Sequence, residues 1–344
     1  MNILFTGAKS NSGYGQATDA FKRAFQELRY FNISYNISND IVNYDKNIKY
    51  DIEFVIGPPS NYVSKAKYKI IYFYWETDRL PDQWVQQIHG YNEIWAPCKL
   101  VEDVCLKSGY NKEIKIIPTP CLIDDSFKSL KLKNSISNYF LNPEYYKFYS
   151  IFQWQPRKGY LELLTAYFEE FQYNDEVVLV IKTNLISQMK EKEIIDTIKN
   201  IKKEKNSNAK VFLITDYLSN IDLFSLHKYG DCFVLPHYGE GWGMPIHEAA
   251  HLGNPIITTK YGGVTEFLNN NVYWIDHKMV SVSGMEWNKV YSSNQNWAKP
   301  NIESLKKHFR DVYNNRIKKS FSFNNFSIKN VSSIIEERLK EIGH

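Results

Sequence analysis

Short apolar runs alternate with amphipathic segments along most of this chain, and this alternation limits the possible folds more than any other feature. A strand pattern at 2–8 is followed by a glycine-containing turn and by a helix pattern from about Gln16 to Leu28. Strands that alternate with helices need crossover connections, so the sequence predicts a mostly parallel sheet covered by helices. Further strand patterns lie at 31–36, 51–57, 68–75, 93–97 and 114–120, and further helix patterns at 81–91 and 99–109.

Residues 121–147 interrupt the alternation, because they are rich in Lys, Ser and Asn and contain no long apolar run. The alternation then restarts with a strand pattern at 148–154 and a helix pattern from Tyr160 to Phe171. Two doubly wound units in tandem would place the carboxyl ends of their strands across a cleft from each other. The remaining strand patterns lie at 176–183, 210–215, 231–236 and 254–259, and a helix pattern lies at 186–205. From Asn296 onward the pattern is helical, and the last helix is expected at about 325–342.

The chain of 344 residues is long enough for two domains that each bury a core. We expect an N-terminal domain over 1–125, a linker over 126–147 and a second domain over 148–320. A C-terminal helix over 321–344 could pack back toward the N-terminal domain.

Composition predicts a soluble globular protein, with 43% hydrophobic and 23% charged residues. The net charge is only +4, so charge alone implies neither nucleic acid nor a membrane as a partner. The four cysteines form no Cys-x-x-Cys pair, which argues against a disulfide framework, and Cys105 and Cys232 are expected in the core. Without a signal-peptide pattern or a run of ~18 apolar residues, we expect a cytoplasmic protein with no stable membrane insertion.

The stretch 237–267 carries the strongest functional signal. A strand pattern leads into a glycine-rich turn, then to Pro245 at a helix start and Gly253 just past its end. In this arrangement backbone amides converge on a phosphate group. Glu248 lies about 200° around the helix from Ile246, so it should face away from the sheet, toward the cleft.

A carboxylate beside an anion site can accept hydrogen bonds from sugar hydroxyls. Two acids bracket the turn, Glu240 and Glu248, and a nucleotide sugar carries both phosphate and hydroxyl groups. The alternative is that Glu248 only stabilises the first helical turn and that Glu240 is an exposed loop residue.

The segment EGWGMPIHEA (240–249), followed by GNPII (253–257) and YGGVTEF (261–267), resembles the donor-site signature of family-4 retaining glycosyltransferases. The resemblance implies the GT-B fold, in which two Rossmann-like domains face each other across a cleft. It implies an acceptor-side N-terminal domain and a C-terminal domain that binds the nucleotide sugar. By this resemblance, Glu248 holds the ribose hydroxyls and Glu240 lies by the donor sugar. The backbone amides after Glu240 face the phosphates and the sugar. The donor-binding residues of this turn are therefore Gly241, Trp242, Gly243 and Met244.

A second element, FQWQPRKGYLELL (152–164), also resembles the family. By resemblance Lys158 neutralises the departing diphosphate, together with an arginine whose usual position is Gln153 here. Arg157 could substitute for that arginine. An Arg-Lys-Gly loop by itself is also typical of surface charge.

Two further loops extend the expected donor site. Gly13-Tyr14-Gly15 follows the first strand, as does the glycine loop beneath the diphosphate in the family, although tight turns also use this pattern. The loop after 210–215 contains Asp216 and Tyr217, and the nucleotide base could lie there. We count Tyr217 among the donor-binding residues.

The string YWETDRLP (74–81) is expected on the acceptor side. Many relatives have a histidine near this position that touches the donor sugar, whereas this chain has Glu76 and Asp78. We expect one of these acids to contact the acceptor. The alternative is a helix cap and an ion pair formed by Asp78 and Arg79.

The family mechanism transfers a hexosyl or pentosyl group with retention at the anomeric carbon. The leaving phosphate takes the proton of the acceptor hydroxyl on the same face, while Lys158, Arg157 and the amides of 242–244 stabilise the charge. No Asp-x-Asp pair occurs in the sequence, so we expect no metal and no cofactor besides the donor. The acceptor is most simply a saccharide or glycan, and a lipid-linked sugar or a modified DNA base is an alternative.

Two other classes of function stay open. His247-Glu248-Ala249-Ala250-His251 matches the zinc-hydrolase pattern H-E-x-x-H, although Pro245 and Gly253 leave a short helix for it. A carbohydrate- or nucleic-acid-binding module of the same fold that has lost catalysis would also fit the missing arginine and histidine.

Overall fold

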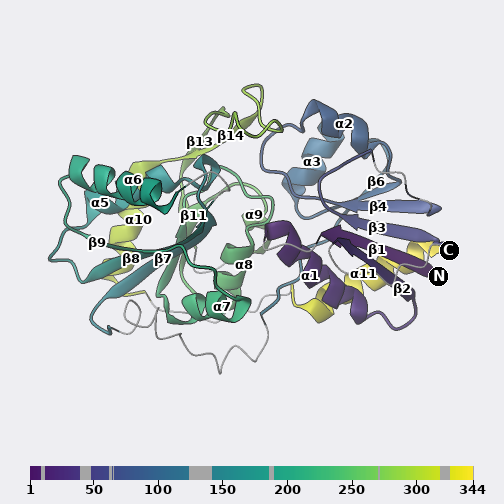
Figure 1. The fold of residues 1–344 in the computed structure, drawn as a ribbon, viewed down its shortest axis with the longest axis horizontal. Coiled ribbons are helices and arrows are strands. Elements are labelled where there is room, and N and C mark those ends of the chain that lie inside the picture. Colours follow the sequence, from purple (N-terminus) through teal and green to yellow (C-terminus); the bar gives the residue numbers. More distant parts are fainter. Residues whose placement is uncertain are drawn as a thin grey trace. The chain divides into compact units, whose positions relative to one another are not determined.

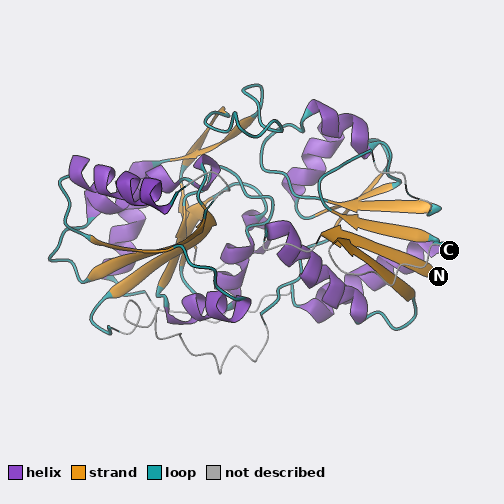
Figure 2. Cartoon of the chain, in the orientation of Figure 1, coloured by secondary structure: helices purple, strands orange, loops and turns teal. Residues whose placement is uncertain are grey.

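The computed structural model describes residues 1–8, 12–38, 48–61, 64, 66–123, 142–185, 190–269, 272–317 and 326–343. The chain divides into two compact units. Unit 1 comprises Met1–Leu122, Glu240–Met244 and Asn324–His344, and unit 2 comprises Ile123–Gly239 and Pro245–Phe323. Each unit contains a six-stranded parallel sheet with helices on both faces, as the alternating pattern predicts (Figure 1, Figure 2).

The sheet of unit 1 has the strand order β2-β1-β3-β4-β5-β6. Helices α1 and α11 cover one face of this sheet, and α2 and α3 cover the other (Figure 1). The strands are β1 (Asn2–Ala8), β2 (Asn32–Ser38), β3 (Ile52–Ile56), β4 (Tyr68–Tyr72), β5 (Glu93–Ala96) and β6 (Glu113–Ile116), and the helices are α1 (Gly13–Gln26), α2 (Asp82–Ile88), α3 (Lys99–Lys107) and α11 (Ile328–Gly343).

The sheet of unit 2 has the order β12-β11-β10-β7-β8-β9. Helices α5, α6 and α10 lie on one face, and α7 and α8 lie on the other (Figure 1). The strands are β7 (Tyr146–Gln153), β8 (Val177–Asn184), β9 (Lys210–Ile214), β10 (Cys232–Leu235), β11 (Ile256–Thr259) and β12 (Val272–Ile275), and the helices are η2 (Pro156–Lys158), α5 (Tyr160–Glu170), α6 (Glu191–Glu204), α7 (Asn220–Tyr229), α8 (Met244–His251), α9 (Val264–Phe267) and α10 (Ile302–Asn314).

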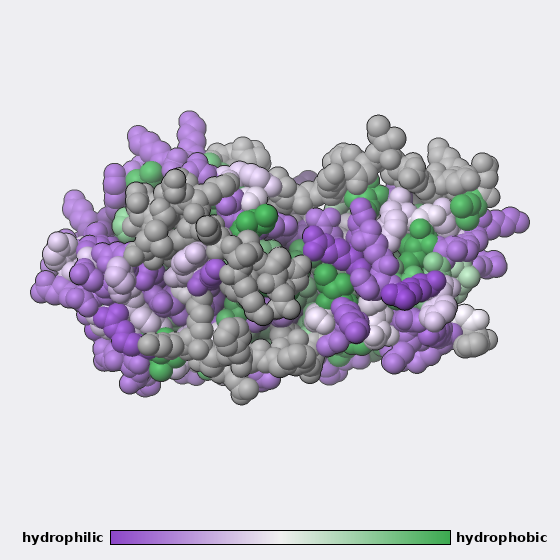
Figure 3. Space-filling model, turned by 90° about the horizontal axis from the view of Figure 1, so that it is seen from below, coloured by the Kyte–Doolittle hydropathy of each residue, from purple (hydrophilic) through white to green (hydrophobic). Residues whose placement is uncertain are grey.

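The strands are apolar on both faces because helices cover both sides of each sheet. In β8, every residue from Val177 to Thr183 is buried. The four cysteines are free thiols in the interior, which confirms the predicted burial of Cys105 and Cys232. Hydrophilic residues cover most of the described surface in Figure 3, and apolar residues appear there in small separate groups. No helix in the described ranges combines the length and apolar character needed to cross a membrane.

The C-terminal helix α11 packs within unit 1. Val331, Ile335 and Leu339 are four residues apart, fully buried, and part of the same core as α1. An ion pair anchors this helix to the sheet, because the guanidinium of Arg338 donates to both carboxylate oxygens of Glu93 at 2.9 and 2.8 Å. The Glu93 side chain is completely buried, so Arg338 neutralises a charge that has no access to water.

Several predicted boundaries differ from the structure. Helix α1 begins at Gly13 rather than Gln16, because the hydroxyl of Ser12 caps it by accepting from the Gly15 amide. Strand β7 begins at Tyr146, inside the predicted linker, while 124–141 lie outside the described residues. Segment 240–244 belongs to unit 1, although the sequence places it in the second domain.

The prediction of helix from Asn296 onward is wrong at its start. Residues Asn296–Pro300 form strand β14, which pairs antiparallel with β13 (His277–Ser281). Trp297 is almost fully buried in a small apolar cluster, so packing of the indole favours the strand. Helix α10 begins only after Asn301, whose side chain accepts from the Ser304 amide.

Candidate functional site

Two loops at the carboxyl ends of the neighbouring strands β7 and β10 are locked together. The Tyr238 amide donates to the carbonyl of Arg157 at 2.8 Å, and Nη1 of Arg157 donates to the carbonyl of Gly239 at 2.5 Å. Gly159 has a φ of +66°, and a Cβ at this position would lie 1.8 Å from the carbonyl oxygen of Pro236. Only glycine allows this approach, so the geometry of the loop requires glycine at position 159.

The predicted catalytic residues lie in these two loops. Arg157 is 8% exposed, and its guanidinium holds the main chain just before Glu240. Lys158 is partly exposed, in the 3-10 turn η2. Gln153, in the position of the family arginine, is exposed at the end of β7. Glu240 is 6% exposed, so it is not the exposed loop residue of the alternative interpretation.

Helix α8 begins and ends where the sequence predicts. Pro245 is in its first turn, and Gly253 follows it with a φ of +74°. The amides of Gly253 and Asn254 donate back to the carbonyls of Ala250 and Ala249, which closes the helix end. Ile246 and Ala249 are part of the core of unit 2, as their spacing predicts.

The sequence predicts that Glu248 faces away from the sheet, toward a cleft, and the structure shows that its side chain meets a neighbouring helix there. Its side chain is only 9% exposed, and its Oε2 lies 3.3 Å from Nε2 of His227. His227 is on α7 and is completely buried, and its Nδ1 lies 3.0 Å from the hydroxyl of Tyr149 on β7. Helical angle alone could not predict this, because α7 covers the face of α8 that the calculation leaves open.

The turn residues 240–244 pack on unit 1. A Cβ at Gly241 would lie 2.6 Å from Cβ of Tyr74, and the carbonyl of Gly241 accepts from the thiol of Cys98 at 3.4 Å. Trp242 is 2% exposed, and Met244 packs against the unit 1 core. Gly243 is buried and has a φ of +86°. The segment expected to donate amides to a diphosphate is therefore covered by side chains in this structure.

The N-terminal loops converge on the same residue of unit 1. The amide of Tyr74 donates to the hydroxyl of Tyr14 at 3.1 Å, and their ring centroids are 5.4 Å apart. Gly13-Tyr14-Gly15 forms the first turn of α1 rather than a separate glycine loop. The structure thus brings three predicted segments together, 13–15, 74–78 and 241–244. Tyr74 is the first residue of the predicted string 74–81, whereas the contact of Cys98 with Gly241 had no signal in the sequence.

Glu76 and Asp78 are partly buried in the loop after β4. This loop is closed on itself, because the indole of Trp75 and the hydroxyl of Thr77 both donate to the carbonyl of Arg79. Pro81 occupies the N-cap position of α2, so the alternative role of Asp78 as the helix cap is wrong.

The sequence analysis did not identify a buried lysine at the carboxyl end of β8 as a site residue. Lys182 is 3% exposed, and its Nζ donates to the carbonyl of Thr183 at 2.8 Å and to Oδ1 of Asn184 at 2.7 Å. Burial lowers the pKa of Lys182 to about 8, and Asp216 acts in the opposite direction. The signal was a single cation in the apolar run VVLVIKT. Tyr217, the predicted base contact, is 70% exposed after β9.

Helix α8 gives the zinc-hydrolase pattern no additional ligands. In the described part of the chain, no three His, Cys, Asp or Glu side chains lie close enough together to hold a metal ion. Glu248 instead contacts His227, which lies outside the H-E-x-x-H pattern.

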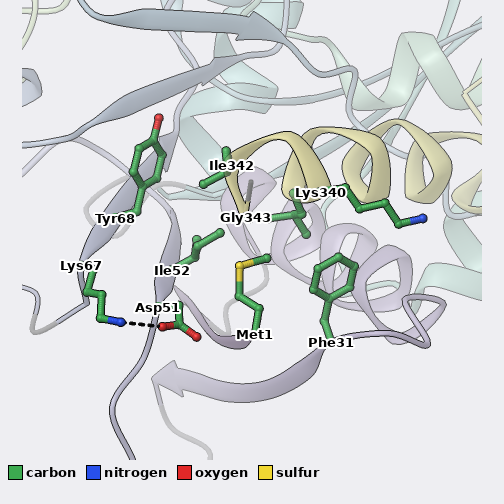
Figure 4. Close-up of a pocket in the computed structure, with 10 residues that line it drawn as sticks. Met1, Phe31, Asp51, Ile52, Lys67, Tyr68, Lys340, Ile342 and Gly343 are labelled. Carbon is green, nitrogen blue, oxygen red and sulfur yellow. Dashed lines mark hydrogen bonds and ion pairs between the residues drawn. The ribbon is translucent and has the colours of Figure 1, made fainter.

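A cavity of 580 Å³ lies elsewhere, at the amino-terminal edge of the unit 1 sheet. Apolar side chains such as Met1, Phe31 and Ile342 line it, together with the ion pair of Lys67 and Asp51 (Figure 4). Ligands of doubly wound folds bind at the carboxyl ends of the strands, which is the opposite edge. We therefore do not assign the donor to this cavity.

The family model of the glycosyl transferases group 1 matches residues 133–326, which is more than half of the chain. The chain belongs to this family. A search among curated proteins gives no match for the sequence. Membership shows a glycosyltransferase domain, which agrees with the resemblance read from 240–267.

Solved structures of similar fold cover nearly the whole chain. Sucrose-phosphate synthase from Thermosynechococcus elongatus aligns with a TM-score of 0.63 at 10% identity, over 99% of this chain and 94% of that chain. Anabaena HepE in complex with UDP-glucose aligns with a TM-score of 0.61 at 12% identity, over 100% and 98%. An E. coli trehalose-6-phosphate structure bound with UDP-2-fluoro glucose gives 0.61 at 9%, over 99% of both. These similarities show the GT-B fold, with its two Rossmann-like domains.

Proposed function

We propose that this protein is a retaining, metal-independent glycosyltransferase of the family-4 type, which transfers a sugar from a nucleotide-sugar donor to a hydroxyl acceptor. The observation that carries the proposal is the pair of interlocked loops after β7 and β10, which holds Arg157, Lys158 and the main chain of 238–239 at the carboxyl edge of the unit 2 sheet. The match of residues 133–326 to the group 1 family supports the same chemistry.

Lys158 and Arg157 have different proposed roles, the first in stabilising charge and the second in positioning the main chain. Lys158 stabilises the leaving diphosphate, since it is the partly exposed cation of η2. Arg157 acts through the main chain, because its guanidinium is committed to the Gly239 carbonyl and so fixes Glu240 beside the donor sugar. Glu248 accepts hydrogen bonds from the ribose hydroxyls. The amides of 242–244 would donate to the diphosphate, next to Gly241, which packs on Tyr74.

The leaving phosphate oxygen takes the proton of the acceptor hydroxyl, so the new bond forms on the face from which the diphosphate departs. No Asp-x-Asp pair occurs in the sequence, which supports a reaction without a chelated metal. UDP-hexoses are the first donors to test, because HepE and the E. coli structure were solved with UDP-glucose and UDP-2-fluoro glucose. A saccharide or glycan is the proposed acceptor class, with a lipid-linked sugar or a modified DNA base as the alternatives.

The test is turnover of UDP-glucose by the purified chain in the presence of EDTA, measured as release of UDP. We expect Lys158→Ala to reduce the rate by roughly 100-fold, the typical effect of removing one charge-stabilising group. Lys199→Ala is the matched control, because Lys199 is exposed on α6. A panel of nucleotide sugars that neither shifts the thermal transition nor releases nucleotide would contradict the proposal.

A further inference from the structure

A chain of four buried polar side chains ends at Glu248. Its Oε2 lies 3.3 Å from Nε2 of His227, whose Nδ1 lies 3.0 Å from the hydroxyl of Tyr149. The side-chain amide of Asn254 completes the chain, at 2.7 Å from the same hydroxyl and 2.9 Å from the carbonyl of His227. All four residues belong to unit 2.

The chemistry of the partners fixes the direction of each hydrogen bond. A carbonyl can only accept, so the NH₂ group of Asn254 must face the carbonyl of His227. The second proton of that NH₂ group is then donated to the hydroxyl oxygen of Tyr149. A carboxylate oxygen accepts, so a neutral His227 ring carries its proton on Nε2, which donates to Glu248, and Nδ1 then accepts the hydroxyl proton of Tyr149.

Packing holds this chain in one arrangement. His227 is completely buried, Tyr149 is 1% exposed and Asn254 is 2% exposed. A Cβ at Gly230 would lie 2.2 Å from the Tyr149 ring, so that glycine provides the space for the ring. The His227 ring packs against Tyr149 and Phe233 at centroid distances of 5.5 and 5.8 Å, and those two rings contact each other at 5.1 Å. Buried and interlocked rings leave the imidazole little freedom to reorient.

Only one carboxylate oxygen of Glu248 takes part in this chain. Within the described residues, the contact with His227 holds the carboxylate through Oε2. The side chain also keeps 9% of its surface exposed. A carboxylate held through one oxygen can present the other to a ligand in a fixed direction.

We propose that His227 is a positioning residue that holds Glu248 through Oε2, so that Oε1 accepts hydrogen bonds from the ribose hydroxyls of the nucleotide. Tyr149 and Asn254 set the tautomer of the His227 ring. This inference rests on the proposed function, because it takes Glu248 as the ribose contact. It predicts that discrimination between ribose and dideoxyribose depends on side chains that never touch the nucleotide.

The test is calorimetric binding of UDP, ADP and GDP, each compared with its 2′,3′-dideoxy form, to the full chain. In the wild type we expect the best ribonucleotide to bind at least about 10-fold more tightly than its dideoxy form, since hydrogen bonds to a charged group are lost. Glu248→Gln and His227→Leu should reduce this preference to less than about 3-fold while affinity for the dideoxy form stays unchanged. His227→Gln should restore most of the preference, because its amide can donate from the position of Nε2.

Controls separate positioning from folding. Tyr149→Phe removes the group that sets the tautomer and should reduce the preference partly, so it tests the inference even if His227→Leu fails to fold. His308→Leu removes another imidazole of unit 2, which contacts the carbonyl of Trp274, and should leave the preference unchanged.

The outcomes distinguish the two proposals. A wild-type protein that binds no nucleoside diphosphate would overturn the proposed function and this inference together. Equal binding of ribo and dideoxy forms by the wild type would overturn the inference and the ribose contact of Glu248, while sugar transfer itself would still be tested by UDP release. A preference that Glu248→Gln abolishes but that folded His227→Leu and Tyr149→Phe both retain would overturn the inference alone.

Discussion

Replacement of Lys182 by methionine should change the pH dependence of stability in a defined direction. Burial lowers the pKa of this amine from 10.5 to about 8. Below pH 8 the folded protein carries a buried positive charge, whereas water hydrates the same charge in the unfolded chain. Burial of the charge therefore lowers the free energy of unfolding. As the pH rises from 8 toward 10.5, the folded state loses its proton first and the unfolded state binds more protons. The stability contributed by this site therefore rises with pH in that window.

The magnitude follows from the size of the pKa shift. Each pKa unit corresponds to about 1.4 kcal/mol, so the cost is about 3 kcal/mol at pH 7 and about 1 kcal/mol at pH 10. Methionine has a similar length and no charge. The free energy of unfolding of Lys182→Met minus that of the wild type should therefore fall by about 2 kcal/mol between pH 7 and pH 10. The loss of the two hydrogen bonds of Nζ adds an offset that hardly depends on pH.

The assay is urea denaturation at both pH values, followed by circular dichroism. Lys199→Met serves as the control, because Lys199 is exposed and its replacement should leave the pH dependence unchanged. A Lys182→Met difference that is constant from pH 7 to 10, or that grows, would refute the assignment of a lowered pKa to Lys182.

Two further substitutions test the fold. Gly159→Ala should destabilise the protein by at least about 2 kcal/mol in urea denaturation, because its Cβ would collide with the Pro236 carbonyl and its φ is positive; a stable, fully active variant would contradict the interlocked loops. Arg338→Met should cost about 3 to 5 kcal/mol by leaving the Glu93 carboxylate buried without a counterion, while Arg316→Met, at a more exposed ion pair, should cost less than about 1 kcal/mol. Equal costs in the two arginine variants would show that α11 is not anchored through Arg338.

The alternating pattern was sufficient to predict both sheets, because crossover connections leave parallel strands as the simple solution. It failed at 296–300, where burial of Trp297 depends on pairing with β13 (His277–Ser281), which the local pattern does not encode. Local signals such as Pro245 and Gly253 placed helix α8 correctly, since both act through the main chain of their own residues.

The environment of the site was less predictable. The contact of Glu248 with His227 depends on how α7 packs on α8, and no local signal encodes that packing. Burial of the turn against Tyr74 and Cys98 likewise arises between segments more than 140 residues apart in the chain. Lys182 could have been noticed as a cation in an apolar strand, but only the structure shows that its amine stays inside.

The most direct test of the central claim is the configuration of the sugar that the protein releases or transfers from UDP-glucose, followed by proton NMR before mutarotation. The account predicts an α-configured glucosyl product, because the donor is α-linked and the reaction retains configuration. A β-configured product would contradict the retaining mechanism, and the absence of any sugar product from every nucleotide sugar tested would contradict the assignment as a glycosyltransferase.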